Sequence, residues 1–169
     1  ELARIFLTTK TCEKYICIDI PPALAFAERL LSETFGDDKM SFWSRDRKKI
    51  DLEDENICYF LTPDQIDQTP SFDLGINKAS FGEMTADIVQ GYIQVLKNKT
   101  FNEFISINQR LKKSNNLETI GEKQYTDFFA PDYECISKAS FSSFKPGLCL
   151  DDIPGKQGEQ LLHFRKVGL

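Results

Sequence analysis

The stretch at residues 15–31, "YICIDIPPALAFAERLL", contains the transition that decides the fold class. It opens with an apolar run rich in β-forming residues, which predicts a buried strand at residues 15–20. Two prolines follow, and proline is well tolerated at the first position of a helix. Apolar residues then recur at helical spacing and predict an amphipathic helix that ends near Gly36. A buried strand that leads directly into a helix is the repeating unit of an α/β fold.

The same alternation continues along the chain. Further apolar runs predict strands at residues 57–62, 72–77 and 103–108, the first two of them buried. Helical spacing predicts helices at residues 1–9 and 121–129. It also predicts a helix whose buried face is Met84, Ile88, Tyr92 and Val95.

Two late strands complete the pattern, at residues 135–144 and 159–167, and a loop rich in proline and glycine separates them. No helix is predicted between them, so they indicate an antiparallel hairpin. The whole order predicts a single α/β domain over residues 1–169. We expect a Rossmann-like, mostly parallel sheet with helices on both faces and the hairpin at its C-terminal edge.

Composition and charge are those of an ordinary globular protein. Of the 169 residues, 41% are hydrophobic and 28% are charged, and the net charge is -5. A negative net charge disfavours a nucleic-acid partner, because phosphate backbones attract basic surfaces. The basic stretch at residues 45–49 lies beside the acidic stretch at residues 51–55, which indicates a solvated loop. No apolar run approaches the roughly 20 residues that a membrane-spanning helix needs.

The cysteines and histidine do not form a metal-binding pattern. The five cysteines are Cys12, Cys17, Cys58, Cys135 and Cys149, and the only histidine is His163. A structural zinc site needs four such ligands, most often at short spacings, so no metal site is predicted. Cysteines scattered through strand-like segments indicate reduced, mostly buried thiols and a cytoplasmic protein.

Polar residues follow the predicted strands, where open α/β sheets bind ligands. Asp19 follows the first strand, and its carboxylate can bind ribose hydroxyls or bond the turn backbone before Pro21. Thr62, Asp64 and Gln65 follow the second strand. They can contact the edge of an adenine ring or form an ordinary proline–aspartate turn.

The next two strand ends carry further candidates. Asn77 and Ser80 follow the third strand, and Asn108, at the end of the fourth, can bond a ligand or cap the strand. Glu83 has two alternative roles. It can form a capping box with Ser80, or it stays in the loop, free for acid–base chemistry, if the helix starts at Thr85 instead.

His163 lies within an alternating strand-like stretch, "LLHFRK". Histidine is a common general base because its pKa lies near neutrality. A structural role within the strand is the alternative to a catalytic one.

Three stretches together resemble a known family. They are "CIDIPPALAFAERLLSETFG" at residues 17–36, "YFLTPDQI" at residues 59–66 and "FDLGINKASFGEMTADIVQGYI" at residues 72–93. They resemble the sugar O-methyltransferases, which are class I S-adenosylmethionine-dependent methyltransferases, over roughly residues 1–110. The resemblance implies S-adenosylmethionine as the cofactor. It also implies a sugar, sugar nucleotide or glycan as the acceptor, in polysaccharide biosynthesis.

The resemblance implies roles for the residues at the strand ends. Asp19 matches the ribose-binding acid, and residues 77–83 match the stretch beside the methyl group and the acceptor. The implied cofactor-binding residues are Asp19, Thr62, Asp64, Gln65, Asn77 and Ser80. The implied catalytic residues are Glu83, as the general base, and His163, as a second candidate, and no metal ligand is implied.

The chain departs from the family at its start. The family's first strand and glycine-rich loop would precede Glu1, so we expect a fragment that binds the cofactor poorly by itself. That strand belongs at the centre of the family's sheet, so we expect a gap, or a strand from another chain, between the strands that carry Ile18 and Ile76.

Two other functions stay open at this stage. A nicotinamide-dependent dehydrogenase also places an acidic residue after its second strand. A methyltransferase-like module without catalytic activity, serving in an assembly, is the third possibility. The sequence predicts no oligomeric state.

Overall fold

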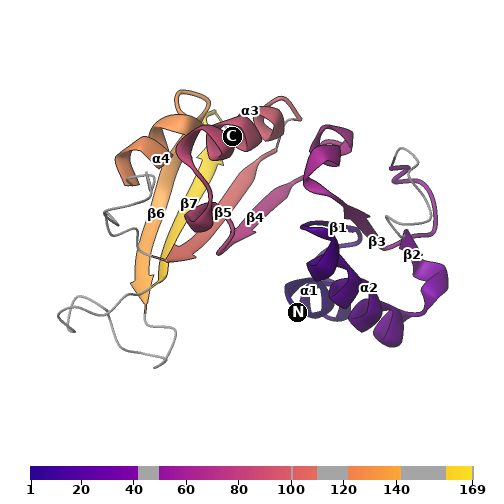
Figure 1. Ribbon diagram of the computed structural model, residues 1–169. Helices are drawn as coiled ribbons and strands as arrows, with labels where there is room; N and C mark the ends of the chain where they lie inside the picture. The colour runs from indigo at the N-terminus through magenta and orange to yellow at the C-terminus, as the bar shows by residue number, and fades with distance from the viewer. Residues whose placement is uncertain (42–49, 100, 110–121, 142–158, 169) are drawn as a thin grey trace. The chain divides into compact units, whose positions relative to one another are not determined.

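The computed structural model describes residues 1–41, 50–99, 101–109, 122–141 and 159–168. The chain divides into two compact units, Glu1–Pro70 and Ser71–Leu169, and each unit is described by itself. Figure 1 shows their helices and strands. The basic stretch at residues 45–49, the loop rich in proline and glycine at residues 145–158 and Cys149 lie outside the described residues.

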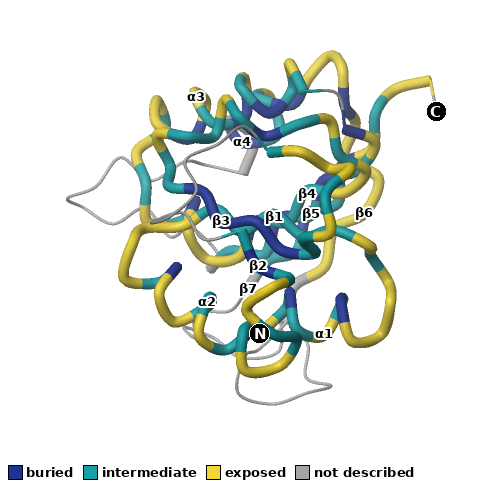
Figure 2. The backbone as a smooth tube through the Cα atoms, turned by 90° about the vertical axis from the view of Figure 1, so that its right-hand side faces the viewer, coloured by how far each residue is buried: buried dark blue, intermediate teal, exposed yellow. Residues whose placement is uncertain are grey.

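The first unit is a three-stranded parallel sheet with two α-helices. Its elements are α1 (Leu2–Thr8), β1 (Tyr15–Ile18), α2 (Pro21–Phe35), β2 (Met40–Ser41) and β3 (Cys58–Leu61), with 3₁₀ turns at Asp37–Lys39 and Pro63–Gln68. The strand order is β1-β3-β2, and Tyr15 lies opposite Cys58. All four residues of the central strand β3 are buried, and Figure 2 shows this strand as a continuous dark segment.

Local sequence sets both ends of α2. Ile20 precedes the helix in an extended conformation, and Pro21 and Pro22 take its first two positions, where their missing N–H groups cost no hydrogen bond. Gly36 follows the helix with φ at 94°, a conformation that glycine adopts without steric strain. The strand–proline–helix transition predicted from residues 15–31 is therefore confirmed.

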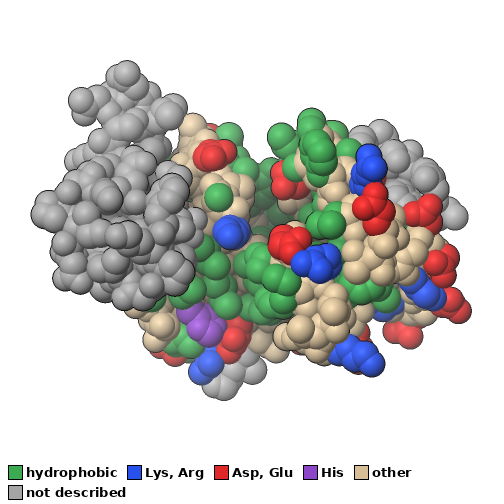
Figure 3. Space-filling view, turned by 90° about the horizontal axis from the view of Figure 1, so that it is seen from below, with side chains coloured by type: hydrophobic (Ala, Val, Ile, Leu, Met, Phe, Trp, Pro, Cys, Tyr) green, Lys and Arg blue, Asp and Glu red, His purple; other side chains and the backbone are tan. Residues whose placement is uncertain are grey.

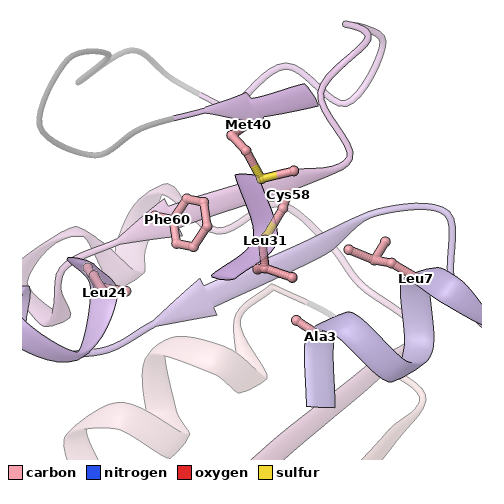
Figure 4. Close-up of a cluster of buried hydrophobic side chains, with 7 residues drawn as sticks. All are labelled: Ala3, Leu7, Leu24, Leu31, Met40, Cys58 and Phe60. Carbon is pink, nitrogen blue, oxygen red and sulfur yellow. The ribbon is translucent and has the colours of Figure 1, made fainter. Parts of the chain in front are cut away.

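The core of the first unit lies between its two α-helices and one face of its sheet (Figure 4). Cys58 and Phe60 are two residues apart on β3, so their side chains point to the same face. Both helices pack on that face. The buried side chains of this core are Ala3, Leu7, Leu24, Leu31, Met40, Cys58 and Phe60.

The second unit is a four-stranded mixed sheet with two α-helices. Its elements are β4 (Leu74–Lys78), a 3₁₀ turn (Phe81–Glu83), α3 (Ala86–Lys97), β5 (Glu103–Gln109), α4 (Glu122–Phe129), β6 (Tyr133–Phe141) and β7 (Glu159–Lys166). The strand order is β4-β5-β7-β6. β4 and β5 are parallel, whereas β7 is antiparallel to both β5 and β6.

Aromatic side chains hold the second unit together. Phe104 on β5 and Phe164 on β7 are register partners, so they share one face of the sheet. The ring of Phe129 on α4 stacks on Phe164 with 4.0 Å between the ring centroids. α3 buries Val89 and Ile93 and contacts α4, and Figure 1 shows both helices on the same side of this sheet. Within each unit, the described helices therefore cover one face of the sheet.

The predicted α/β class is confirmed, because parallel strands alternate with helices and the last two strands form an antiparallel hairpin. Ile18 and Ile76 lie on β1 and β4, which are edge strands of different sheets. The two strands are therefore not hydrogen-bonded to each other, and the gap expected between them stays a prediction. Among the described residues, no helix combines the length and the apolar character needed to cross a membrane.

The predicted buried face of α3 is wrong. The helix buries Val89, Ile93 and Leu96, whereas Ile88 from the predicted face is exposed. Residues 88 and 89 are about 100° apart around the helix axis, so the two apolar stripes lie on adjoining sides of the helix. Periodicity alone does not choose between them, and the packing of the helix on the sheet does.

Two other expectations about burial are also wrong. β4 is an edge strand, and its only buried residue is Asn77, while Leu74 is exposed. Among the described cysteines only Cys58 is buried, and Cys135 on the edge strand β6 is exposed. In both cases a strand at the edge of a sheet has a neighbour on one side only.

Gly75 and Gly91 form a matched pair for substitution. A Cβ atom at Gly75 would lie 2.5 Å from Cδ2 of Phe104, whose ring is fixed among other aromatic rings. A Cβ atom at the exposed Gly91 of α3 would meet no atom within 4 Å. We expect Gly75→Ala to destabilise the protein by about 1–3 kcal/mol through overpacking. We expect Gly91→Ala to stabilise it by about 0.5–1 kcal/mol, because alanine suits a helix better and restricts the unfolded chain.

Urea unfolding of the wild type and both variants measures these two effects. Shifts of opposite sign would confirm the packing of Phe104 over β4. A stabilising effect of Gly75→Ala would contradict it.

Candidate functional site

The carboxyl ends of β4 and β5 bring polar side chains together. These strands are parallel and neighbouring, and Asn77 lies opposite Ser106. Both residues are buried, with exposed fractions of 7% and 3%. Buried polar groups are costly unless they are hydrogen-bonded, so their partners define this part of the structure.

Asn108 links the two strands to the turn that follows β4. Its Oδ1 accepts a hydrogen bond from the Gly82 N–H at 3.1 Å. Its Nδ2 donates to Asn77 Oδ1 at 2.9 Å and to Ser106 Oγ at 2.7 Å. Asn108 was expected either to bond a ligand or to cap the end of the strand. These contacts are those of a cap at the strand end.

Asn77 extends the network to Ser80. Asn77 Oδ1 also accepts from the Phe81 N–H at 3.4 Å, and Asn77 Nδ2 donates to Ser80 Oγ at 2.5 Å. The predicted site residues Asn77 and Ser80 are therefore in direct contact. Ser106 was missed by the sequence analysis, although its position two residues after Phe104 places it on the same inward face of β5.

The turn after β4 has an unusual backbone. Ala79 has φ at 67°, in the left-handed region, which costs a residue other than glycine about 1–2 kcal/mol. Its N–H donates to the Ile107 carbonyl at 2.8 Å, which holds the turn against β5. No local pattern predicts this conformation, because neither glycine nor asparagine occupies the position. Strain held by surrounding hydrogen bonds is a frequent property of functional sites.

The start of α3 decides between the two roles of Glu83. The helix begins at Ala86 after Thr85, whose hydroxyl donates to Asp87 Oδ1, and the Ser80 side chain caps nothing. Glu83 therefore stays in the turn, as the second alternative predicted. Its side chain is exposed and makes no hydrogen bond or ion pair within the part of the chain that the structure describes. Its carboxylate is available for a ligand or for proton transfer.

The remaining predicted residues of the cofactor site lie in the first unit. Asp19 follows β1, is exposed, and accepts the Ile20 N–H on Oδ1 at 2.8 Å. Gln65 Oε1 accepts hydrogen bonds from the backbone N–H and the hydroxyl of Thr62 at 3.0 and 2.9 Å. Because the Asp19 N–H donates to Leu61, Asp19 and Thr62 lie at the same edge of this sheet. Asp64 is exposed on the turn beside Thr62.

His163 lies apart from the network in the second unit. It pairs with Ile105, and alternate residues of a strand point to opposite faces, so His163 points away from the face of Ser106 and Asn108. Its Nε2 lies 3.0 Å from Glu103 Oε2. Glu103 Oε1 also accepts from two guanidinium nitrogens of Arg165, at 2.8 and 3.0 Å. Figure 3 shows the histidine, in purple, beside acidic and basic side chains.

These contacts describe an ion cluster rather than a site at the strand ends. The structure thus brings Asn77, Ser80 and Asn108 together and leaves His163 outside that group. Across the described ranges, no three His, Cys, Asp or Glu side chains converge where a metal ion could bind.

No protein-family model matches this chain, and no curated protein matches it in sequence. Its fold is similar to that of the mitomycin 7-O-methyltransferase MmcR, with a TM-score of 0.56 and 12% identity over 90% of this chain and 42% of that one. It is also similar to the [4+2]-cyclase SpnF, with a TM-score of 0.56 and 13% identity over 90% of this chain and 66% of that one. A third is the magnesium protoporphyrin IX methyltransferase ChlM from Synechocystis PCC 6803 with bound SAH. Its TM-score is 0.52, with 9% identity over 98% of this chain and 80% of that one.

At these low identities the likeness establishes the fold alone, which is the Rossmann-like α/β fold predicted from the sequence. The chain spans less than half the length of MmcR, 42%. One of the three proteins is named as a cyclase, so the fold does not by itself fix the reaction.

The ion cluster of Glu103 gives a pH-dependent prediction. The carboxyl pKa of Glu103 lies below its ordinary value of 4.5, first because Arg165 donates hydrogen bonds to it and then because His163 contacts it. A lowered folded-state pKa stabilises the fold above the unfolded-state value, and this stabilisation is lost as the pH falls through the folded-state pKa. We expect Glu103→Gln to be less stable than the wild type near neutrality and to approach it in acid.

Urea unfolding at a series of pH values from about 6 down to about 3 measures this difference. The matched control is Glu134→Gln, because Glu134 lies opposite Arg165 on β6 but forms no ion pair in the described part of the chain. A stability difference for Glu103→Gln that stays constant across the series would contradict the assignment.

Proposed function

We propose that this chain is part of an S-adenosylmethionine-dependent O-methyltransferase that acts on a sugar hydroxyl. The observation that carries the proposal is the exposed carboxylate of Glu83, which bonds no described residue, on a turn fixed at the carboxyl end of β4. Ligands of open α/β sheets bind at that end of the strands. The fold likeness to two methyltransferases and the sequence resemblance at residues 17–36, 59–66 and 72–93 support it.

Residues after β1 and β3 would bind the nucleoside part of the cofactor. One oxygen of Asp19 accepts the Ile20 N–H, so the other is the one that would accept from ribose hydroxyls. The carbonyl oxygen of Gln65 is used by Thr62, which leaves its amide N–H groups for an adenine ring nitrogen. The Asp64 carboxylate on the same turn would then accept the hydrogen bond from the exocyclic amine of adenine.

Glu83 is the proposed general base. S-adenosylmethionine, when bound, would supply an electrophilic methyl group. The chain's part is to hold the acceptor oxygen in line with that group and to remove the hydroxyl proton. A carboxylate on a turn fixed at Gly82 can receive that proton. His163 does not share this role in our proposal, because it points to the other face of its sheet and bonds Glu103.

In our proposal both compact units belong to one methyltransferase-like domain. The proposal keeps the expectation of a cytoplasmic enzyme in polysaccharide biosynthesis.

Two other functions compete with this one. The nicotinamide-dependent dehydrogenase would also use Asp19, whereas a non-catalytic assembly module would need neither Asp19 nor Glu83. The methyltransferase is favoured because the exposed carboxylate of Glu83 at a strand end has a role in it and in neither alternative.

Binding of S-adenosylhomocysteine tests the cofactor assignment. The measurement is calorimetry on the purified protein, with NADH as the competing ligand. We expect Asp19→Asn to weaken S-adenosylhomocysteine binding roughly tenfold, because a charge-assisted acceptor for the ribose is lost. Its melting temperature should change little, since asparagine still presents Oδ1 to the Ile20 N–H.

Asp37→Asn, an exposed carboxylate of the same unit, is the matched control and should bind like the wild type. An unchanged affinity of Asp19→Asn with a lowered melting temperature would remove Asp19 from the site. Binding of NADH instead of S-adenosylhomocysteine would favour the dehydrogenase, and binding of neither would favour the assembly module.

Substitution of Glu83 tests the catalytic assignment. Methyl transfer from radiolabelled S-adenosylmethionine to a panel of free sugars and sugar nucleotides would be measured for the wild type and Glu83→Gln. We expect a loss of roughly 100-fold or more in turnover, because the amide cannot accept the proton. Stability should not change, because the Glu83 side chain is exposed and bonds nothing in the described chain. Glu53→Gln, at another exposed position, is the control, and full activity of Glu83→Gln would rule out Glu83 as the base.

A further inference from the structure

The hydrogen-bond network behind Ser80 has a single consistent direction. The backbone N–H of Gly82 can only donate, so the atom of Asn108 that faces it must be the carbonyl oxygen. The amide nitrogen of Asn108 then faces Asn77. Because that nitrogen donates, the Asn77 atom that accepts from it must be the carbonyl oxygen. The backbone N–H of Phe81, a second fixed donor, points to the same oxygen of Asn77. Two independent backbone groups therefore set the same orientation.

The direction of these hydrogen bonds determines whether the Ser80 hydroxyl acts as a donor or an acceptor toward a ligand. With its carbonyl oxygen used, Asn77 turns its amide nitrogen toward Ser80 Oγ. An amide nitrogen only donates, so the Ser80 oxygen must accept, and its hydroxyl proton points elsewhere. Ser80 is exposed, and the described residues offer no acceptor for that proton. The hydroxyl is thus an outward hydrogen-bond donor.

Glu83 lies on the same turn, and its side chain is a hydrogen-bond acceptor. Its backbone N–H donates to the Ser80 carbonyl at 3.1 Å, so the two residues are held close. An ionised carboxylate only accepts hydrogen bonds. Residues three apart in a 3₁₀ turn lie on the same side of it, so this turn offers one donor and one acceptor on one side.

A hydroxyl group matches this pair. It can donate its proton to Glu83 and accept the Ser80 proton on its oxygen. An alkylamine is protonated near neutrality and only donates, and a carboxylate only accepts. The turn is also fixed in advance, because Ala79 is held in the left-handed region and Phe81 packs in the aromatic core. A fixed donor needs no reordering when the ligand binds.

We propose that Ser80 is a specificity-determining residue that binds the oxygen of the acceptor hydroxyl while Glu83 takes its proton. This inference rests on the proposed function and assigns Ser80 to the acceptor rather than to the cofactor. In the reaction the acceptor oxygen forms a bond to the methyl carbon as the carbon–sulfur bond breaks. The bonding pair stays on sulfur, and the acceptor proton passes to Glu83. Ser80 keeps its own proton throughout.

Three substitutions separate this role from a structural one. Ser80→Ala removes the donor, and Ser80→Thr keeps it. Asn77→Asp keeps the shape of Asn77 but replaces its donating nitrogen with an accepting oxygen, so Ser80 must donate inward. That carboxylate would still receive hydrogen bonds from Phe81, Asn108 and Ser80.

Steady-state methyl transfer to the sugar panel and calorimetry with S-adenosylhomocysteine would be measured for each variant. We expect Ser80→Ala and Asn77→Asp to raise KM for the acceptor roughly five- to tenfold, which corresponds to one lost hydrogen bond. Their affinity for S-adenosylhomocysteine should not change, and Ser80→Thr should stay near the wild-type KM. A KM of Ser80→Ala equal to that of the wild type, or a loss confined to S-adenosylhomocysteine binding, would overturn the proposal.

Neutron diffraction from the deuterated wild-type protein locates the deuterons of this hydrogen-bond network without any ligand. A deuteron on Asn77 Nδ2 that points to Ser80 supports the direction argued above, and a deuteron on Ser80 Oγ that points to Asn77 overturns it. This readout also decides the direction if Asn77→Asp does not fold.

The outcomes separate this proposal from the proposed function. A wild type that methylates amines or thiols but no hydroxyl would retain the methyltransferase function and overturn the Ser80–Glu83 assignment. A wild type that neither binds S-adenosylhomocysteine nor transfers a methyl group would overturn the proposed function, and this proposal with it, whatever the neutron result.

Discussion

The parallel pairing of β4 with β5 is the constraint on which the candidate site depends. Both strands run in the same direction, so the side chains at their carboxyl ends meet at one edge of the sheet, and Asn77 comes to lie beside Ser106. The Phe104 ring lies over Gly75 in the same ladder, which ties this register to the aromatic core. A shift of one residue would turn every side chain of β4 to the other face and separate Asn77 from Asn108.

The site is built from neutral polar groups inside and charged groups outside. The amide oxygen and nitrogen of Asn77 and of Asn108 all form hydrogen bonds, to each other, to neighbouring serine side chains and to the turn backbone. The strained backbone at Ala79 is held by a separate hydrogen bond, from its own N–H to the Ile107 carbonyl. Glu83 remains in solvent, where its charge costs little and its carboxylate stays accessible to a ligand.

The comparisons with known proteins establish the fold. The reaction has to be inferred from the side chains of the candidate site. Proteins named as methyltransferases and one named as a cyclase share this fold at low sequence identity. Function on such a fold depends on the few side chains at the strand ends. In our proposal those side chains are Asp19 in the first unit and the turn that carries Ser80 and Glu83 in the second, and both follow strands at the end where α/β sheets bind ligands.

Apart from the short strand β2, the sequence by itself determined the order of helices and strands, the α/β class and the strand ends where polar residues gather. These follow from periodicity, proline and glycine, which act over a few neighbouring residues. Only the tertiary structure decided that α3 starts after Thr85 and leaves Glu83 in the turn, and that Val89 rather than Ile88 faces the core. It alone paired Asn77 with Asn108 and His163 with Glu103, which lie 31 and 60 residues apart. Such contacts depend on strand register, and register is fixed by the packing of the whole sheet rather than by any local pattern.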